Sequence, residues 1–148
     1  MAQSLHQIYG HIVFSTKDRK ELITNEFESD LYKYICGTVK NLNGFVLAIN
    51  GMPDHLHIIF RASKHVTDID FIKQIKAGSS KWISAKTNQD FQWQKGYGWF
   101  SVGAKDIQAA IQYVENQKEH HKVMSFQDEL RKILTSYKID YDEKYLWD

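Results

Sequence analysis

The order of apolar patterns along the chain limits its fold more than any other feature. Four short runs are rich in β-branched and aromatic residues and predict strands, at 6–16, 45–50, 55–60 and 97–102. Three longer stretches repeat apolar residues three and four positions apart and predict helices, at 25–41, 67–85 and 105–120. A further short helix is expected from about residue 125, ahead of an irregular tail.

Strand, helix, strand, strand, helix, strand, helix is the element order of split βαβ proteins. It predicts an α+β fold, ferredoxin-like or RRM-like (βαββαβα), with an antiparallel sheet, helices on one face and an extra C-terminal helix. The other face of the sheet would be open to a ligand or a second chain. No linker, repeat or low-complexity tract divides the chain, so we expect a single domain over 1–148, with the last helix and tail at about 125–148.

Local signals place several boundaries. Asn43 and Gly44 predict the end of the first helix, and residues 51–54 predict a turn between two antiparallel strands. Thr67 and Asp70 have the spacing of a capping box, so we expect a helix to start there. The residues predicted to line the buried side of that helix are Ile69, Ile72, Ile75, Trp82 and Ile83.

Composition excludes several classes of protein. Hydrophobic residues make up 43% of the 148, which excludes a disordered chain, and no apolar run approaches the roughly 20 residues of a membrane helix. The first six residues lack the charged and apolar regions of a signal peptide, so we expect none. The single cysteine, Cys36, excludes an internal disulfide and a cysteine zinc site, and it fits a reducing cytoplasm.

The total charge hides an uneven distribution. Lysine and arginine number 19 against 18 acidic residues, a net charge of +1 that argues against a strongly basic nucleic-acid binder. Residues 61–105, however, hold eight basic and three acidic side chains, a net +5, whereas residues 106–148 hold six and nine, a net −3. The chain therefore has a basic middle and an acidic tail, although solvated helix faces would explain both.

A His-Leu-His motif lies inside the third predicted strand. Because strand side chains alternate, His55 and His57 project from one face about 6–7 Å apart, while Leu56 and Ile58 point into the core. Two neighbouring imidazoles can fill two positions of one metal ion. The alternative is an ordinary pair of surface histidines on an open sheet face.

Two other features could carry chemistry. Tyr113 and Gln117 are four residues apart on a predicted helix, so they share a face that His120 or His121 continues. The alternative is a packing tyrosine and a surface glutamine. The run 91–100 is crowded with aromatic residues and glycines, which suits either stacking on bases or the core of a small sheet.

These features occur together, in an order that resembles the single-tyrosine transposases of bacterial insertion sequences, the IS200-like group of the HUH nuclease superfamily. The superfamily is named for a His–hydrophobic–His motif, which residues 53–57 (Pro-Asp-His-Leu-His) resemble. The resemblance covers nearly the whole chain, and the other segments that carry it are 11–17, 93–98, 100–102, 113–117 and 145–147. Domesticated relatives that process repeated extragenic hairpins share the same motifs.

The resemblance implies roles for particular residues. Tyr113 would attack a phosphate of single-stranded DNA and form a covalent 5′-phosphotyrosine link, so the chain would cut and rejoin strands. His55, His57 and Gln117 would hold a divalent metal ion, Mg²⁺ or Mn²⁺, that polarises the phosphate. The residues expected to assist them are Asp54, His120 and His121.

The implied substrate is single-stranded DNA with a small hairpin near each element end. The basic residues predicted to contact its phosphates are Lys73, Lys76, Lys81 and Lys95. In relatives the tyrosine helix often docks on the partner subunit, so we expect a homodimer in which Tyr113 could act in trans. The implied location is the bacterial cytoplasm, at the nucleoid, with no membrane partner.

Two other functions stay open on the residues alone. One is a non-catalytic RRM-like module that binds single-stranded nucleic acid on its open sheet face. The other is a metal-dependent phosphodiesterase in which water attacks the phosphate and Tyr113 only packs.

Overall fold

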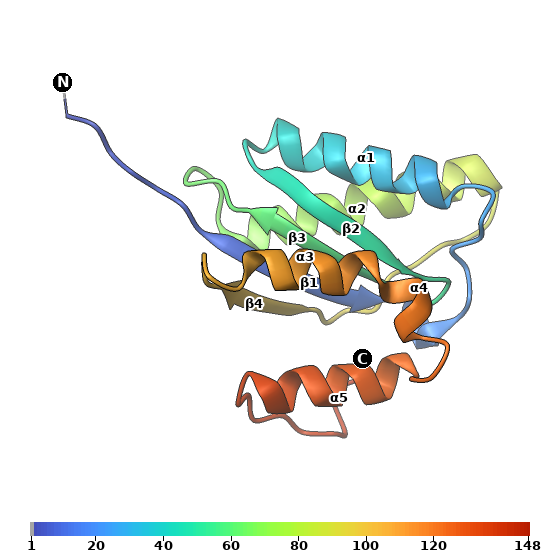
Figure 1. Ribbon diagram of the computed structural model, residues 1–148. Helices are drawn as coiled ribbons and strands as arrows, with labels where there is room; N and C mark the ends of the chain where they lie inside the picture. The colour runs from blue at the N-terminus through green and yellow to red at the C-terminus, as the bar shows by residue number, and fades with distance from the viewer. Residues whose placement is uncertain (1) are drawn as a thin grey trace.

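One antiparallel sheet forms the centre of the computed structural model, which describes residues 2–148 (Figure 1). Its strands are β1 (Tyr9–Ser15), β2 (Phe45–Met52), β3 (His55–Arg61) and β4 (Gly98–Val102). They lie side by side in the order β2–β3–β1–β4, and every neighbouring pair is antiparallel. The first and third strands are therefore central, and the predicted ferredoxin-like α+β fold is confirmed.

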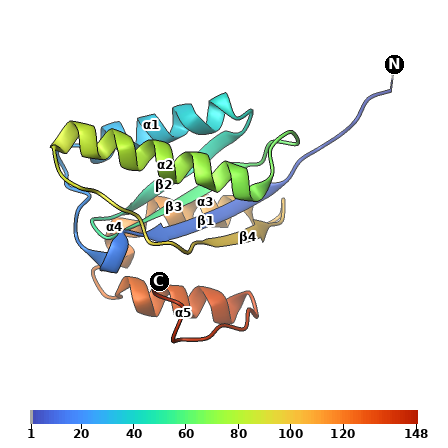
Figure 2. The same ribbon diagram turned by 180° about the vertical axis from the view of Figure 1, so that it is seen from behind.

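The helices lie on both faces of this sheet. Helices α1 (Glu28–Asn41) and α2 (Asp68–Thr87) cover one face, as Figure 2 shows from the opposite side. Three further helices lie over the other face: α3 (Ile107–Glu115), α4 (Gln117–His120) and α5 (Phe126–Ser136). The face that we expected to be open to a ligand is thus covered by helices from the C-terminal third of the chain.

The face beneath α1 and α2 holds the main hydrophobic core. Alternation along the strands sends every second side chain to this side, as the strand pattern predicts. Its members from the sheet are Ile12, Phe14, Leu56, Ile58 and Phe60, and its members from the helices are Leu31, Ile35, Val39, Phe71, Ile72, Ile75 and Ile83. All are at least 96% buried, so this face is a dry, closely packed layer.

The second face carries two smaller apolar clusters with polar side chains between them. Helix α3 packs through Ile107 and Val114 onto β2, β3 and β4. Helix α5 packs through Phe126, Leu130 and Leu134, against Val13 of β1 and Phe100 of β4. The His55 and His57 side chains lie between these clusters, on the face opposite the main core.

Most predicted boundaries are confirmed to within a few residues. Asn43 adopts φ 63° after α1, and the Thr67 hydroxyl accepts a hydrogen bond of 3.3 Å from the Asp70 amide at the start of α2. Gly51 lies so close to the turn before β3 that a Cβ there would stand 2.1 Å from the carbonyl oxygen of His55. Only glycine, which has no Cβ atom, fits at that position.

Two sequence predictions about the helices differ from the structure. Ile69 is 70% exposed rather than buried, because it lies in the first turn of α2, to one side of the stripe formed by Ile72 and Ile75. The helix expected over 105–120 is interrupted at Asn116, which separates α3 from α4. Within residues 2–148, none of the helices has the length and apolar character needed to cross a membrane.

Candidate metal and nucleophile site

The two histidines of β3 are completely buried beneath α4 and α5. The Nδ1 atom of His55 lies 2.6 Å from Asp54 Oδ1, and the Nδ1 atom of His57 lies 2.8 Å from Nε2 of His11 on β1. Each ring is therefore fixed through one nitrogen and turns its Nε2 atom toward a shared centre. Ligating histidines in metal sites are held in this way by a second hydrogen bond.

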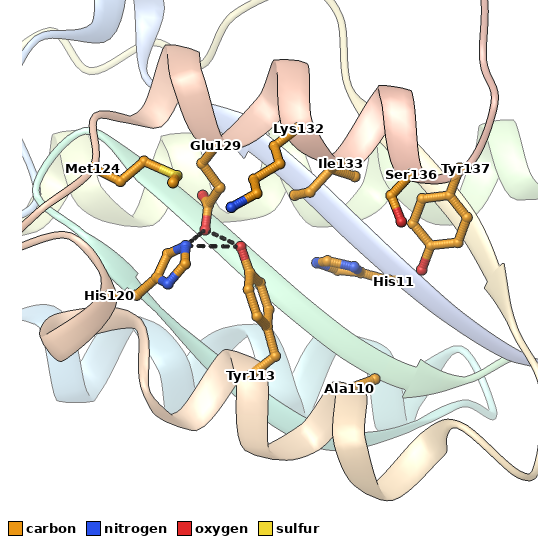
Figure 3. Close-up of a pocket in the computed structure, with 10 residues that line it drawn as sticks. All are labelled: His11, Ala110, Tyr113, His120, Met124, Glu129, Lys132, Ile133, Ser136 and Tyr137. Atoms are coloured by element: carbon orange, nitrogen blue, oxygen red, sulfur yellow. Dashed lines mark hydrogen bonds and ion pairs between the residues drawn. The ribbon is translucent and has the colours of Figure 1, made fainter.

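Residues of α3 and α4 complete one side of this centre. Gln117 is fully buried, and its side-chain oxygen lies 3.2 Å from His55 Nε2. Tyr113, one turn earlier, points its hydroxyl into the space between α3 and α5 (Figure 3). The four residues expected to do the chemistry, His55, His57, Tyr113 and Gln117, thus meet within one chain.

Helix α5 adds Glu129, which the sequence prediction missed. Its Oε1 atom lies 2.9 Å from His57 Nε2, 3.0 Å from His121 Nε2 and 3.4 Å from His55 Nε2. Its Oε2 atom accepts hydrogen bonds from the Tyr113 hydroxyl and, at 2.9 Å, from Gln117 Nε2. One carboxylate therefore contacts the imidazole group on one side and the tyrosine on the other.

A signal for Glu129 exists in the sequence. It lies three residues after Phe126 and next to Leu130, so it is an acidic residue on the apolar face of an amphipathic helix. It is only 1% exposed, and a buried carboxylate needs charged or hydrogen-bonding partners. The sequence therefore indicates that Glu129 is buried, but it does not identify the side chains that contact it.

The two histidines at the end of α4 have different surroundings. His121 Nδ1 lies 2.6 Å from the carbonyl oxygen of Met124, and its buried Nε2 atom has no hydrogen-bond partner among the described residues. His120 is more exposed and lies 3.4 Å from the Tyr113 hydroxyl. Of the three residues expected to assist, His120 thus lies beside the tyrosine, His121 lies beside Glu129, and Asp54 contacts His55.

Burial and charge shift the acidities of these groups. Burial would raise the pKa of Glu129, but its contacts with His121, His55 and His57 lower it well below the usual range, so the carboxylate is ionised. Burial, and then the negative charge of Glu129, raises the pKa of Tyr113 above its usual range. Without a cation at the centre, the tyrosine is therefore a weaker acid than a free phenol.

The donor chemistry at the centre fits a divalent metal ion. Ligand atoms of four groups, His55, His57, His121 and Glu129, all lie within 4.8 Å of one another, and the Gln117 oxygen lies beside them. Imidazole nitrogens and carboxylate oxygens are the ligands that Mn²⁺ and Zn²⁺ accept, and Mg²⁺ accepts the oxygens. The Nε2 atom of His121 is a buried ligand atom that has no hydrogen-bond partner among the described residues.

A cavity of about 330 Å³ opens beside the Tyr113 hydroxyl, between α3 and α5 (Figure 3). Glu129, His11 and His120 line it together with Lys132 of α5, whose side chain points toward the cavity. The cavity connects the tyrosine to the surface of the molecule. A phosphate group that reached Tyr113 would meet positive charge from Lys132 there.

The predicted DNA contacts fall into two groups. Lys73, Lys81 and Lys95 are exposed on the surface of the basic segment. Lys76 instead donates hydrogen bonds of 2.7, 3.2 and 2.8 Å to the carbonyl oxygens of residues 94, 95 and 96, and burial lowers its pKa to about 8. Lys76 therefore fixes the loop before β4, and its ammonium group is not free for a phosphate.

Part of the aromatic run belongs to the core. Phe91 and Trp93 are buried, and each ring meets its neighbour edge-on, with Trp93 also lying against Phe14. The Trp93 indole donates a 2.9 Å hydrogen bond to Ser79 of α2. Tyr97 is 41% exposed, so it is one ring of this run that a base could reach.

Comparison with known proteins agrees with the geometry. A model of the family described as IS200-like transposase matches residues 4–117, a segment that contains the His55–His57 pair, Tyr113 and Gln117. The chain belongs to the IS200-like transposase family. Because a transposase moves DNA, membership assigns the chain to DNA transposition, and a non-catalytic binding module is no longer favoured.

A relative is similar to this chain in sequence, and two solved structures share its fold. The ISDra2 transposase TnpA of Deinococcus radiodurans is 26% identical over 124 residues, or 78% of this chain and 87% of the relative. A crystal structure from the same organism, described as a transposase, has a TM-score of 0.64 and 20% identity over 79% of this chain and 98% of that one. A REP-associated tyrosine transposase bound to a REP hairpin has a TM-score of 0.60 and 15% identity, over 82% of this chain and 74% of that one.

Proposed function

We propose that this transposase cuts and rejoins single-stranded DNA through a covalent link between Tyr113 and a 5′-phosphate. The observation that carries the proposal is the position of the Tyr113 hydroxyl, which shares the Glu129 carboxylate with His57. The nucleophile and the imidazole pair are therefore two sides of one site.

The reaction replaces one phosphate ester bond with another, so the number of phosphate ester bonds does not change. The Tyr113 oxygen forms a bond to phosphorus, its proton is lost to a base, and the bond to the 3′ oxygen breaks. That oxygen takes up one proton and leaves as a 3′-hydroxyl. Attack of a 3′-hydroxyl on the phosphotyrosine reverses each step, so strands are rejoined without ATP.

Each residue of the site has a separate task in this proposal. His55, His57 and Gln117 would hold a divalent cation, Mg²⁺ or Mn²⁺, which when bound acts as a Lewis acid on the scissile phosphate. Asp54 and His11 fix the rings of the two histidines through their Nδ1 atoms. Helix α3 positions Tyr113, and the cavity beside it admits the phosphate near Lys132.

The proposed substrate is single-stranded DNA with a hairpin, as in the REP-bound relative. Lys73, Lys81 and Lys95 would contact its phosphates without reading sequence. Replacement of any one of these lysines with alanine should weaken binding modestly and flatten its dependence on salt by about 0.7 in the log–log slope. Binding is therefore best measured at low salt.

A denaturing gel tests the proposal directly. The protein is incubated with end-labelled hairpin DNA and Mg²⁺ or Mn²⁺, and a covalent protein–DNA adduct is expected. Tyr113→Phe should remove the adduct completely, because phenylalanine has no nucleophilic oxygen, while DNA binding in a native gel should remain. Tyr97→Phe, which changes another exposed tyrosine, is the matched control and should keep the adduct.

Other outcomes would favour other functions. Cleavage that survives in Tyr113→Phe would show that water is the nucleophile and that the protein is a phosphodiesterase. Binding without cleavage in the wild-type protein would favour the non-catalytic module. We also propose a homodimer, which the molecular mass in solution tests. Mixing Tyr113→Phe with His57→Ala protein tests whether the tyrosine acts in trans, because adduct formation would return only if one subunit supplies the tyrosine to the other.

A further inference from the structure

Two donors at the metal centre come from outside the segment that matches the family. The match ends at residue 117, whereas His121 follows α4 and Glu129 lies on α5. We propose that His121 and Glu129 are metal ligands in addition to His55, His57 and Gln117, so that the bound cation fastens α5 to the sheet. The inference deepens the proposed function and rests on it for its role in catalysis, but metal binding itself is measurable without DNA.

The spacing of the donor atoms supports shared ligation. Atoms that bind one cation at about 2.1 Å stand about 3.0 to 3.4 Å from their neighbours around it. Glu129 Oε1 lies 2.9, 3.0 and 3.4 Å from the Nε2 atoms of His57, His121 and His55. The carboxylate oxygen therefore occupies a corner of a ligand shell and leaves room for the ion among the four atoms.

Hydrogen positions support the same conclusion for His121. A carbonyl oxygen only accepts, so His121 Nδ1 must carry the proton in its 2.6 Å contact with Met124. Its buried Nε2 atom lies 3.0 Å from Glu129 Oε1, and the two atoms form no hydrogen bond in the described part of the chain. A divalent cation bound between the two atoms would satisfy both of them.

His55 has the same arrangement. Its Nδ1 atom donates to the carboxylate of Asp54 at 2.6 Å, and its Nε2 atom faces the side-chain oxygen atoms of Gln117 and Glu129. Carboxylate, imidazole and metal in this order is a common way to orient a ligating histidine. The Nε2 atoms of His55 and His121 thus both face the same oxygen atom of Glu129.

The enlarged donor set changes which metal is preferred. Two imidazoles and one amide oxygen suit Mg²⁺ or Mn²⁺, and a carboxylate suits both, but a third imidazole favours Mn²⁺ and Zn²⁺ over Mg²⁺. We therefore expect Mg²⁺ to displace bound Mn²⁺ only when Mg²⁺ is in large excess. Removal of His121 should reduce this selectivity more than removal of Glu129, because the imidazole is the softer donor.

The test measures Mn²⁺ binding to the full chain by electron paramagnetic resonance, without DNA. His121→Ala and Glu129→Gln should each weaken Mn²⁺ affinity about tenfold to a hundredfold. Asp128→Asn removes the same charge from an exposed neighbour on α5 and should bind Mn²⁺ as the wild type does. Pulsed measurements should show one ¹⁴N imidazole coupling fewer in His121→Ala.

Unfolding without metal separates ligation from a structural role. If Glu129 only neutralises the histidines, Glu129→Gln should lower the melting temperature equally with Mn²⁺ or with a chelator. If it is a ligand, most of the difference between variant and wild type should appear only with Mn²⁺, because binding stabilises the folded state. Equal differences in the two conditions would overturn the proposal.

The outcomes also separate this proposal from the proposed function. Unchanged Mn²⁺ affinity in both variants, together with loss of binding in His57→Ala, would reject His121 and Glu129 as ligands and leave the family site intact. No Mn²⁺ binding in the wild type would reject both metal assignments. The phosphotyrosine proposal would then depend on the adduct assay alone.

Discussion

The two faces of the sheet share the same strands but bury different chemistry. On β3, Leu56 and Phe60 enter the dry core beneath α1 and α2, while His55 and His57 enter the polar centre beneath α4 and α5. Both sets are completely buried. The comparison shows that burial serves stability on one face and the positioning of reactive groups on the other, at adjacent positions of one strand.

This difference predicts separate effects for neighbouring substitutions, of which the largest concerns the polar face. His57→Ala removes a proposed metal ligand and should slow adduct formation about 1000-fold or more, which corresponds to about 4 kcal/mol of activation free energy. The adduct gel in Mn²⁺ measures it. Adduct formation near the wild-type rate would show that the polar face is not the catalytic face.

The matching change on the other face should act on stability. Phe60 is fully buried against Phe71 and Trp99, so Phe60→Ala should lower the free energy of unfolding by about 3–5 kcal/mol. Urea unfolding measures this loss. At a temperature where the variant remains folded, its adduct rate should match the wild type, and a large loss of rate would mean that the faces are not independent.

The smallest effect, per unit of pH, concerns acid. Burial, and then the charge of His57, lowers the pKa of His11 from 6.5 to about 3. As the pH falls, His11 therefore takes up a proton near pH 6.5 in the unfolded chain but only near pH 3 in the folded chain. Stability is fully present above pH 6.5 and is lost as the pH falls from 6.5 toward 3, by up to about 1.4 kcal/mol per pH unit.

Replacement of this histidine isolates its contribution. His11→Gln keeps a polar partner for His57 Nδ1 but cannot titrate, so the decline in unfolding free energy below pH 6.5 should become shallower by about one proton. Urea unfolding in chelator, from pH 4 to pH 8, measures the slope. Identical slopes in the two proteins would mean that the pKa of His11 is not lowered in the folded chain.

The sequence predicted the fold because local patterns and the sheet agree. Periodicity located every strand and main helix, and alternation placed His55 and His57 opposite Leu56 and Ile58. The spacing of Tyr113 and Gln117 put both on one side of the site, even though Asn116 interrupts the helix between them. These features depend on neighbours in the chain, so the chain order was enough.

The residues that the prediction missed depend on tertiary contacts. His11 meets His57 only because β1 pairs with β3 in one register, and Glu129 reaches the imidazoles only because α5 docks on the second face. Lys76 has the same exposed helix pattern as Lys73, but the loop before β4 lies against it and takes its hydrogen bonds. Spacing along the chain does not predict these tertiary contacts.

The central position of β1 has a consequence for the order in which this protein can assemble. Tyr9, near the start of the chain, pairs with Val102 on β4, and its strand also pairs with β3. While the chain is being synthesised, β2 and β3 can form a hairpin early, but β1 cannot gain its second neighbour until residue 102 has emerged. The histidines are therefore in place on β3 before their carboxylate exists, and Glu129 is the last donor to reach them.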